Sequence, residues 1–516
     1  MRRALRCLPL LLVAACTRTG PQRKPNPPEG APPAFPTSAT LAGREIATLD
    51  AGPWTVRRVA VRDAEAAKGD ALGSAGRRHG GGAAPPAGAP MPAPTTAAPS
   101  APPPPTSPMP VPRDAAEADG GRGVAPASGA DAKARPGETA RGRQGTPLRA
   151  GSTDDNEDFD AFLKFLAAWG DRPTTAPKHD VLDVSDRRFI AVVDAQGRPW
   201  PGARVRVADE SRDRVAWTAT TYGDGRTPFY PRVADRDLRT ALAGKAPSGG
   251  WVVEVEAGGA HASARWDGTG DVLTVPVAAT RPEGAVPLDV AIVLDTTGSM
   301  GDEIDRIKTT LASVVARVRE AGPGVDLRFG AVVYRDLGDD YVTMRHGFTG
   351  DVAAFQRALT AVSAAGGGDY AESMNQGLAE AVGRLDWRAG AAKVAFLIAD
   401  APPHTDYAGD VPYGTSLVAA VGEGIRVHAV AASGLDDFGT LVFRQAAQLT
   451  RGKFVFIEYG DLASTAASHG VGGRVQGNNL DDILVGALRA EIEGWGRAPA
   501  APSTAPAPES AAPRGR

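Results

Sequence analysis

Cysteine is nearly absent from this chain, whose 516 residues contain only two, Cys7 and Cys16. Later segments therefore cannot be cross-linked by internal disulfides, and any domain there must be held together by core burial alone. Long apolar runs are missing too: no stretch of roughly 18 or more apolar residues exists, which excludes an ordinary transmembrane helix. The net charge is −3 and the pI about 6.2. That balance favours neither nucleic acid nor an acidic surface as a partner.

The first 16 residues, MRRALRCLPLLLVAAC, have the organisation of an export signal. Arginines precede an apolar core at 8–15 that is too short to span a membrane. The ending VAAC resembles the lipobox of bacterial lipoproteins, which implies cleavage before Cys16, lipidation of that cysteine and attachment to a membrane. Thr17 follows instead of an acid, which favours the outer membrane, on its periplasmic or surface face. An ordinary cleaved signal with an incidental cysteine is the alternative.

Composition divides the rest of the chain into segments. Residues 17–153 are rich in proline, alanine and glycine and poor in aromatic and β-branched residues, so they are predicted to form a disordered tether. Within them, 40–63 alternates weakly and is compatible with a strand. An acidic start followed by apolar residues at helical spacing predicts a helical connector at 154–186. Residues 497–516 return to proline and alanine and are predicted to be a disordered tail.

Short alternating strands are predicted within 187–280. ARVRV at 203–207 and WVVEVEAGG at 251–259 alternate apolar with charged residues, and glycine-containing turns separate the runs. This pattern predicts an antiparallel β-sandwich. The stretch VVDAQGRPWPGARVRV, followed by TATTYGDGRTPFYP, resembles the carboxypeptidase-regulatory-like, prealbumin-type sandwiches. The resemblance implies a spacer or adhesive module without a catalytic cluster.

Residues 285–496 follow a different pattern, in which apolar runs of strand length alternate with longer helical patterns. The runs lie at 288–295, 327–334, 341–348, 393–400, 425–432 and 453–457. Continuous apolar strands flanked by amphipathic helices are buried on both faces. The sequence therefore predicts an α/β fold with a doubly wound, mostly parallel sheet in this region.

Oxygen-bearing side chains follow two of these strands. Asp295 ends the first strand, with Thr297 and Ser299 at alternate positions after it, and Asp400 ends the run that begins at 393. Asp369 lies in the glycine-rich loop GGGDYAES. Ligands bind beyond the carboxyl ends of parallel strands, so we expect these side chains to converge. Three acids alone would raise one another's pKa, whereas a divalent cation would stabilise them together. We expect Mg²⁺ first, with Mn²⁺ or Ca²⁺ as alternatives.

The motifs DTTGSM, GGGDYAE and LIADAPPH occur in the order and spacing of von Willebrand factor A domains, and residues 285–496 resemble that family. The pattern Asp-x-Thr-x-Ser resembles the first loop of its metal-ion-dependent adhesion site. The resemblance implies that Thr297 and Ser299 contact the metal directly. It implies that Asp295 and Asp400 act mostly through water.

The second loop departs from the pattern of many family members, which have a threonine there. Asp369 in its place implies tighter metal binding and a metal less electrophilic toward an acidic partner. Asp336, in YRDLGDD, and His404, in APPHTDY, are candidate rim residues. A solvated loop for Asp336 and a structural or exposed role for His404 are the alternatives. His428 lies within an apolar strand and is predicted to be a core histidine.

These features predict a non-catalytic, lipid-anchored protein of the cell envelope. Its metal-loaded domain would bind a protein or surface polymer that the sequence does not name. A scaffold of an envelope complex, with a metal that serves stability alone, is the alternative. A serine hydrolase is disfavoured because TGSMG at 297–301 lacks the glycine two residues before the serine of a nucleophile elbow. No nucleic acid partner is expected.

Overall fold

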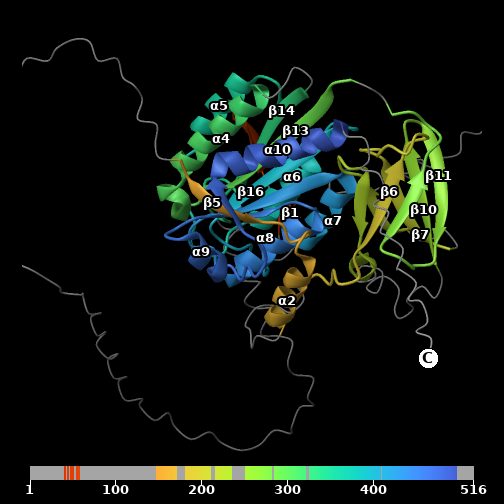
Figure 1. Ribbon diagram of the computed structural model, residues 1–516. Helices are drawn as coiled ribbons and strands as arrows, with labels where there is room; N and C mark the ends of the chain where they lie inside the picture. Colours follow the sequence, from red (N-terminus) through yellow and green to blue (C-terminus); the bar gives the residue numbers. More distant parts are fainter. Residues whose placement is uncertain are drawn as a thin grey trace, which may run out of the picture. The chain divides into compact units, whose positions relative to one another are not determined.

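Figure 1 shows the protein as a computed structural model. The structure describes residues 40–41, 44–45, 47–51, 54–58, 147–170, 181–210, 215–234, 250–281, 284–320, 325–407 and 410–496. The signal peptide at 1–16, most of the tether and the tail at 497–516 lie outside the described residues, so the predictions made for them stay predictions. Every helix among the described residues is too short or too polar to cross a membrane.

The main sheet has ten strands in the order β19-β5-β18-β17-β16-β13-β14-β15-β4-β3. Its five central strands run parallel to one another. They are β18 (Phe454–Ile457), β17 (Ile425–Ala431), β16 (Ala392–Ala399), β13 (Val286–Asp295) and β14 (Val325–Tyr334). The flanking strands pair antiparallel, as β15 (Thr343–Thr349) does with β14. The prediction of a mixed α/β fold with a largely parallel sheet is thus confirmed.

Side chains of alternate residues on β13 enter two different cores, because successive strand residues face opposite sides of a sheet. Leu288, Val290, Ile292 and Leu294 belong to one apolar cluster, and Ala291 and Val293 to the other. The first cluster includes residues of α4 (Ile304–Glu320), α5 (Val352–Thr360) and α10 (Leu480–Gly496). The second includes residues of α6 (Met374–Arg384), α7 (Tyr413–Glu423) and α8 (Asp437–Leu449). Helices therefore cover both faces of the sheet.

The strand β5 (Arg149–Thr153) lies inside this sheet, although the sequence placed these residues at the end of the tether 17–153. It pairs antiparallel with β18 and with β19 (Gln476–Asn479). Gly151 permits this close fit, since a Cβ there would collide with the Phe456 ring. The helix α2 (Phe159–Gly170) follows and lies within the predicted connector 154–186.

The weakly alternating stretch 40–63 contributes strands at the other edge of the sheet. There β4 (Trp54–Arg58) pairs antiparallel with β15, and β3 (Ala47–Ala51) pairs with β4. Two short strands, β1 (Thr40–Leu41) and β2 (Arg44–Glu45), pair only with each other. Part of the predicted tether is therefore built into the sheet.

Residues 187–280 form a four-stranded and a three-stranded sheet, in the orders β11-β10-β7-β8 and β12-β6-β9. The strands are β6 (Arg188–Val193), β7 (Arg204–Asp209), β8 (Val215–Thr220), β9 (Arg226–Phe229), β10 (Trp251–Ala257), β11 (Ala260–Trp266) and β12 (Val272–Pro276). The larger sheet is antiparallel as expected, but β6 and β12 pair in parallel. The resemblance to prealbumin-type sandwiches stays a prediction.

Charged contacts join residues 187–280 to the main sheet and its helices. The carboxylate of Glu491 on α10 accepts from the backbone N–H of Gly223 at 3.0 Å and from Nε of Arg426 at 2.8 Å. Arg451 forms a two-bond ion pair with Asp224 at 2.8 and 2.9 Å. These contacts and β5 come from widely separated parts of the chain, so the main sheet is stabilised by segments far from it in sequence.

Candidate functional site

The predicted site lies where β13 and β16 end. Asp295 Oδ1 accepts from the backbone N–H of Thr297 at 2.8 Å and from its hydroxyl at 2.7 Å. The Thr297 hydroxyl is 3.3 Å from that of Ser299, which donates to Asp400 Oδ1 at 3.1 Å. Four of the five residues predicted to hold a metal are thus brought together in one chain of hydrogen bonds.

A close approach between two loops closes this site. Thr297 is extended, and the short 3-10 helix η2 (Gly298–Asp302) follows it and leads into α4. The Gly298 N–H donates to the carbonyl of Gly366 at 3.0 Å, and a Cβ on Gly298 would lie only 2.9 Å from that oxygen. Glycine at 298 therefore lets the glycine-rich loop 366–368 pack directly against the first loop.

Asp295 is the most deeply buried acid of the site, with 0% of its surface exposed. Its pKa is raised to about 7, chiefly by burial and also by the nearby carboxylates of Asp400 and Asp336, while the hydrogen bonds from Thr297 oppose the shift. Its Oδ2 is buried and has no hydrogen-bond partner among the described residues. A buried acceptor without a donor destabilises the folded state by roughly 1–3 kcal/mol or more if charged. This oxygen is therefore available to an added ligand such as a cation.

Glu372 is a site residue that the sequence reasoning missed. It is 3% exposed, and its Oε2 is buried without a hydrogen-bond partner among the described residues. Its pKa is raised to about 9, chiefly by burial and next by the charges of Asp295 and Asp336. A Cβ on Gly367 would lie 2.8 Å from Glu372 Oε1 and 3.4 Å from the Thr297 Cβ, so the carboxylate lies beside the first loop. The signal was present as the second acid of GGGDYAES.

Two backbone hydrogen bonds fix the position of Glu372. Its N–H donates to the carbonyl of Pro402 at 3.0 Å, and its carbonyl accepts from the N–H of His404 at 3.1 Å. These bonds join the residue to the loop that follows Asp400. The second acid of the motif is thereby held next to both metal-binding loops proposed from the sequence.

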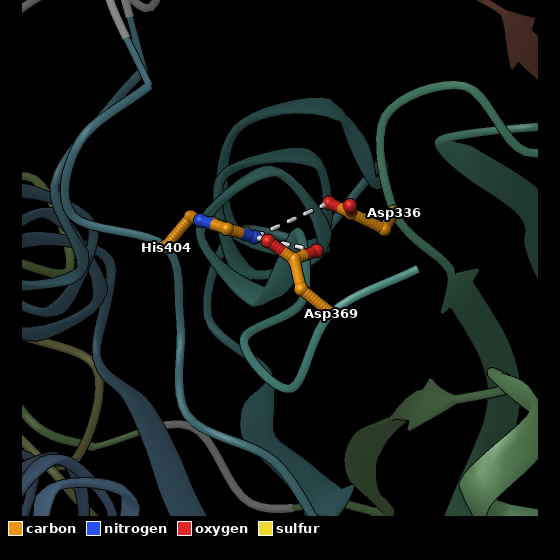
Figure 2. Close-up of side chains that lie close together, drawn as sticks. All are labelled: Asp336, Asp369 and His404. Carbon is orange, nitrogen blue, oxygen red and sulfur yellow. Dashed lines mark ion pairs between the residues drawn. The ribbon is translucent and has the colours of Figure 1, made fainter. Parts of the chain in front are cut away.

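Asp369 and the two candidate rim residues gather in a separate cluster next to this chain of hydrogen bonds (Figure 2). His404 Nε2 lies 3.6 Å from Asp369 Oδ1 and 3.8 Å from Asp336 Oδ1. Asp336 is 1% exposed and His404 6%, so Asp336 is not in a solvated loop and His404 is not exposed, whereas a structural role for His404 is untested. The Asp369 side chain remains 55% exposed.

His428 is a buried core histidine, as the sequence predicts. It is 3% exposed, and its Nδ1 accepts from the backbone N–H of Lys453 at 3.0 Å. Burial lowers its pKa to about 3. A neutral, internally bonded imidazole on β17 has a packing role and stands apart from the site.

The donor set fits a hard divalent cation. It combines carboxylate and hydroxyl oxygens, the ligands that such cations prefer. Two of the carboxylates, Asp295 and Glu372, each keep a buried oxygen without a partner among the described residues. Ser299 is exposed, so the site is open to solvent at this residue. A cation entering there would meet acids whose charges otherwise repel one another.

Comparisons with known proteins point to the same region. Residues 289–409 match the von Willebrand factor A domain family. Among curated proteins, the alpha-protein kinase vwkA of Dictyostelium discoideum is 29% identical over 124 residues, which are 23% of this chain and 19% of the kinase. The match thus spans about a fifth of that protein.

Solved structures that match part of this chain include two proteins of known source. The pilus adhesin SpaC of Lactobacillus rhamnosus GG, in its open conformation, has a TM-score of 0.30 and 13% identity, over 49% of this chain and 33% of that chain. Proximal thread matrix protein 1 of the mussel byssus has a TM-score of 0.28 and 16% identity, over 38% of this chain and 48% of that chain. The family match and the parallel sheet with its site at the strand ends together identify residues 289–409 as a von Willebrand factor A domain.

Proposed function

We propose that this domain binds a divalent cation and uses it to bind a protein or a surface polymer, without catalysis. Asp295, Thr297, Ser299, Glu372 and Asp400 would hold the cation, with Mg²⁺ the first expectation and Mn²⁺ or Ca²⁺ the alternatives. The supporting observation is the pair of unpartnered buried oxygens, Asp295 Oδ2 and Glu372 Oε2, beside the hydrogen-bonded chain. When bound, the cation neutralises these acids and offers an electrophilic centre to an oxygen of the partner.

The setting of this activity is part of the proposal. Lipidation at Cys16 would attach the chain to the outer membrane, and the domain would act in the cell envelope. A non-catalytic role agrees with the environment of Ser299, whose hydroxyl meets Thr297 and Asp400. A nucleophilic serine is commonly activated by a histidine, whereas the Ser299 hydroxyl donates to a carboxylate that we assign to the cation. If the metal served stability alone, chelator would lower the melting temperature without releasing any partner from an envelope extract.

Metal-dependent melting tests the cation site. In full-length protein, Mg²⁺ at about 100 times its Kd adds roughly 2.7 kcal/mol of stability. For a domain of this size, that raises Tm by about 5–10 °C relative to chelator. Asp295→Asn should abolish the rise, because it removes a carboxylate from the centre of the site. Asp305→Asn is the matched control, since Asp305 is an acid on the first turn of α4 with an 87% exposed side chain. A folded wild-type protein that shows no shift in Mg²⁺, Mn²⁺ or Ca²⁺ would refute the site.

A pair of conservative variants separates the two acids of the glycine-rich loop. Glu372→Gln should weaken Mg²⁺ binding by at least about 10-fold, because loss of even a group that only supports a metal ligand costs about 10- to 100-fold. Asp369→Asn should leave Mg²⁺ affinity within about twofold, because its exposed carboxylate lies at His404. Isothermal titration of both proteins with Mg²⁺ measures the difference. The reverse ranking would restore Asp369 as the second-loop ligand.

A further inference from the structure

Three side chains from three separate loops converge beside the site just described (Figure 2). Asp336 follows β14, Asp369 belongs to the glycine-rich loop before α6, and His404 lies in the loop after β16. One oxygen of each carboxylate and a ring nitrogen of the histidine all lie within 4.8 Å of one another. None of the three is among the residues proposed above to hold the first cation.

The imidazole of His404 is held in a defined orientation. Its Nδ1 lies 2.9 Å from Asp406 Oδ1, and its ring stacks on that of Tyr407 with centroids 3.9 Å apart and planes at 15°. The residue is 6% exposed, and its Nε2 has no hydrogen-bond partner among the described residues. Figure 2 shows this nitrogen pointing between the two carboxylates. A neutral histidine that donates from Nδ1 to Asp406 presents the lone pair of Nε2 to Asp336 and Asp369.

The carboxylate of Asp336 is held just as firmly. The Tyr407 hydroxyl donates to both of its oxygens at 2.9 Å, and the Ser373 hydroxyl donates to Oδ1 at 3.1 Å. Ligands of bound metals are oriented in this way by surrounding hydrogen bonds, and the free N–H of a metal-binding histidine is commonly donated to a carboxylate. Asp406, Tyr407 and Ser373 would supply that support here.

We propose that Asp336, Asp369 and His404 form a second cation site that takes Zn²⁺ or a similar transition metal. Ligand atoms about 2.0–2.1 Å from a tetrahedral zinc lie about 3.4 Å apart. The observed separations of 3.6 and 3.8 Å from His404 Nε2 approach this value. Three protein ligands leave a fourth position for water or a partner group.

The chemistry of the two sites differs in a way that separates their metals. The first site offers oxygen atoms alone, which suit Mg²⁺ and Ca²⁺. The second adds an imidazole nitrogen, a ligand that favours zinc and its neighbours. The domain would then carry two unlike cations side by side. The competing explanation is a protonated His404 that forms ion pairs with both acids and takes no metal.

Cobalt serves as the probe for this site, because Co²⁺ in a tetrahedral site that includes nitrogen absorbs visible light far more strongly than octahedral Co²⁺ bound by oxygen. Full-length protein in saturating Mg²⁺ is titrated with Co²⁺, and Zn²⁺ is then added to displace it. We expect one equivalent of strongly absorbing Co²⁺, fully displaced by Zn²⁺. His404→Phe, which keeps the stacked ring, should lower Co²⁺ affinity at least 100-fold. Asp369→Asn, at a half-exposed position, should lower it at least 10-fold.

Two control variants complete the experiment. His261→Gln changes an exposed histidine on β11 and should leave the absorption unchanged. Asp295→Asn should abolish the Mg²⁺ effect on melting while it preserves the Co²⁺ spectrum, so failure of one site is distinguishable from failure of the other. The proposal is overturned if wild-type protein gives no tetrahedral spectrum, or if His404→Phe binds Co²⁺ as wild type does. A Mg²⁺-dependent Tm rise in His404→Phe verifies that this variant is folded.

Discussion

In chelator, the protein should lose stability as the pH rises from about 4 to 9, and Mg²⁺ should remove most of that loss. The folded-state pKa of Asp295 is about 7 and that of Glu372 about 9, with burial the main cause of both shifts. Their unfolded values are about 4. At intermediate pH the folded state therefore binds protons that the unfolded state has released, and its free energy of unfolding falls as the pH rises.

The pH range over which stability is lost is set by the pKa values of each acid in the unfolded and folded states. For Asp295 it accumulates between about pH 4 and 7, and for Glu372 it continues to about pH 9. Asp295 alone, shifted by about 3 pKa units, contributes on the order of 4 kcal/mol at about 1.4 kcal/mol per unit. A bound cation takes the place of the protons, so the loss should shrink in Mg²⁺ while Mg²⁺ affinity rises with pH.

Urea unfolding at pH 5, 7 and 9, in chelator and in Mg²⁺, measures this effect. His428 and His469 titrate in the opposite sense, because burial lowers their pKa values to about 3 and 4. Their contributions are the same in both solutions and cancel in the difference. Asp295→Asn should remove the part of the loss between about pH 4 and 7, since the amide does not titrate, and leave the part that Glu372 causes at higher pH. Identical pH dependence in chelator and Mg²⁺ would contradict the electrostatic account of the site.

The fold and the first loop of the site could be predicted because their signals are local. A continuous apolar strand such as β13 can only be buried on both faces, and acids after such strands meet at one edge of the sheet. No further information than this was needed to predict that four residues converge, namely Asp295, Thr297, Ser299 and Asp400. The hydrogen-bonded chain that joins them follows from where two parallel neighbouring strands end.

Other features depend on contacts that sequence periodicity does not carry. Glu372 and Asp369 are both acids of one short motif, and only the packing of their loop decides which is buried beside Thr297. In the sequence, nothing distinguishes His404 from other histidines in loops. Only the structure shows that its ring stacks on that of Tyr407. The sequence of β5 is RAGST, which has no apolar alternation that would predict a strand. It pairs within the sheet because its small residues fit between β18 and β19.

The attachment of β5 gives the second large expected effect: Asp155→Ala should destabilise the protein by about 3–5 kcal/mol. Asp155 follows β5, and its carboxylate accepts from Arg444 of α8 at 2.7 and 2.9 Å. The side chains of both are almost fully buried, at 3% and 1% exposed. Removing the acid leaves a buried guanidinium with its charge uncompensated. At 2–4 °C per kcal/mol, Tm should fall by roughly 10 °C.

Two further variants show whether this loss comes from the unpaired charge. Asp155→Leu combined with Arg444→Met removes both charges and should recover much of the stability, because apolar replacement of a whole buried pair is often nearly neutral. Arg474→Ala breaks an exposed ion pair with Asp158 at 3.4 Å and should change stability by less than about 1 kcal/mol. If Asp155→Ala lowered stability as little as Arg474→Ala, β5 would contribute little to the stability of the sheet. If Asp155→Ala lowers stability strongly and the double variant recovers it, residues from 149 onward are part of the domain. Only the loss of a segment's contact within the core can leave Arg444 buried and unpaired.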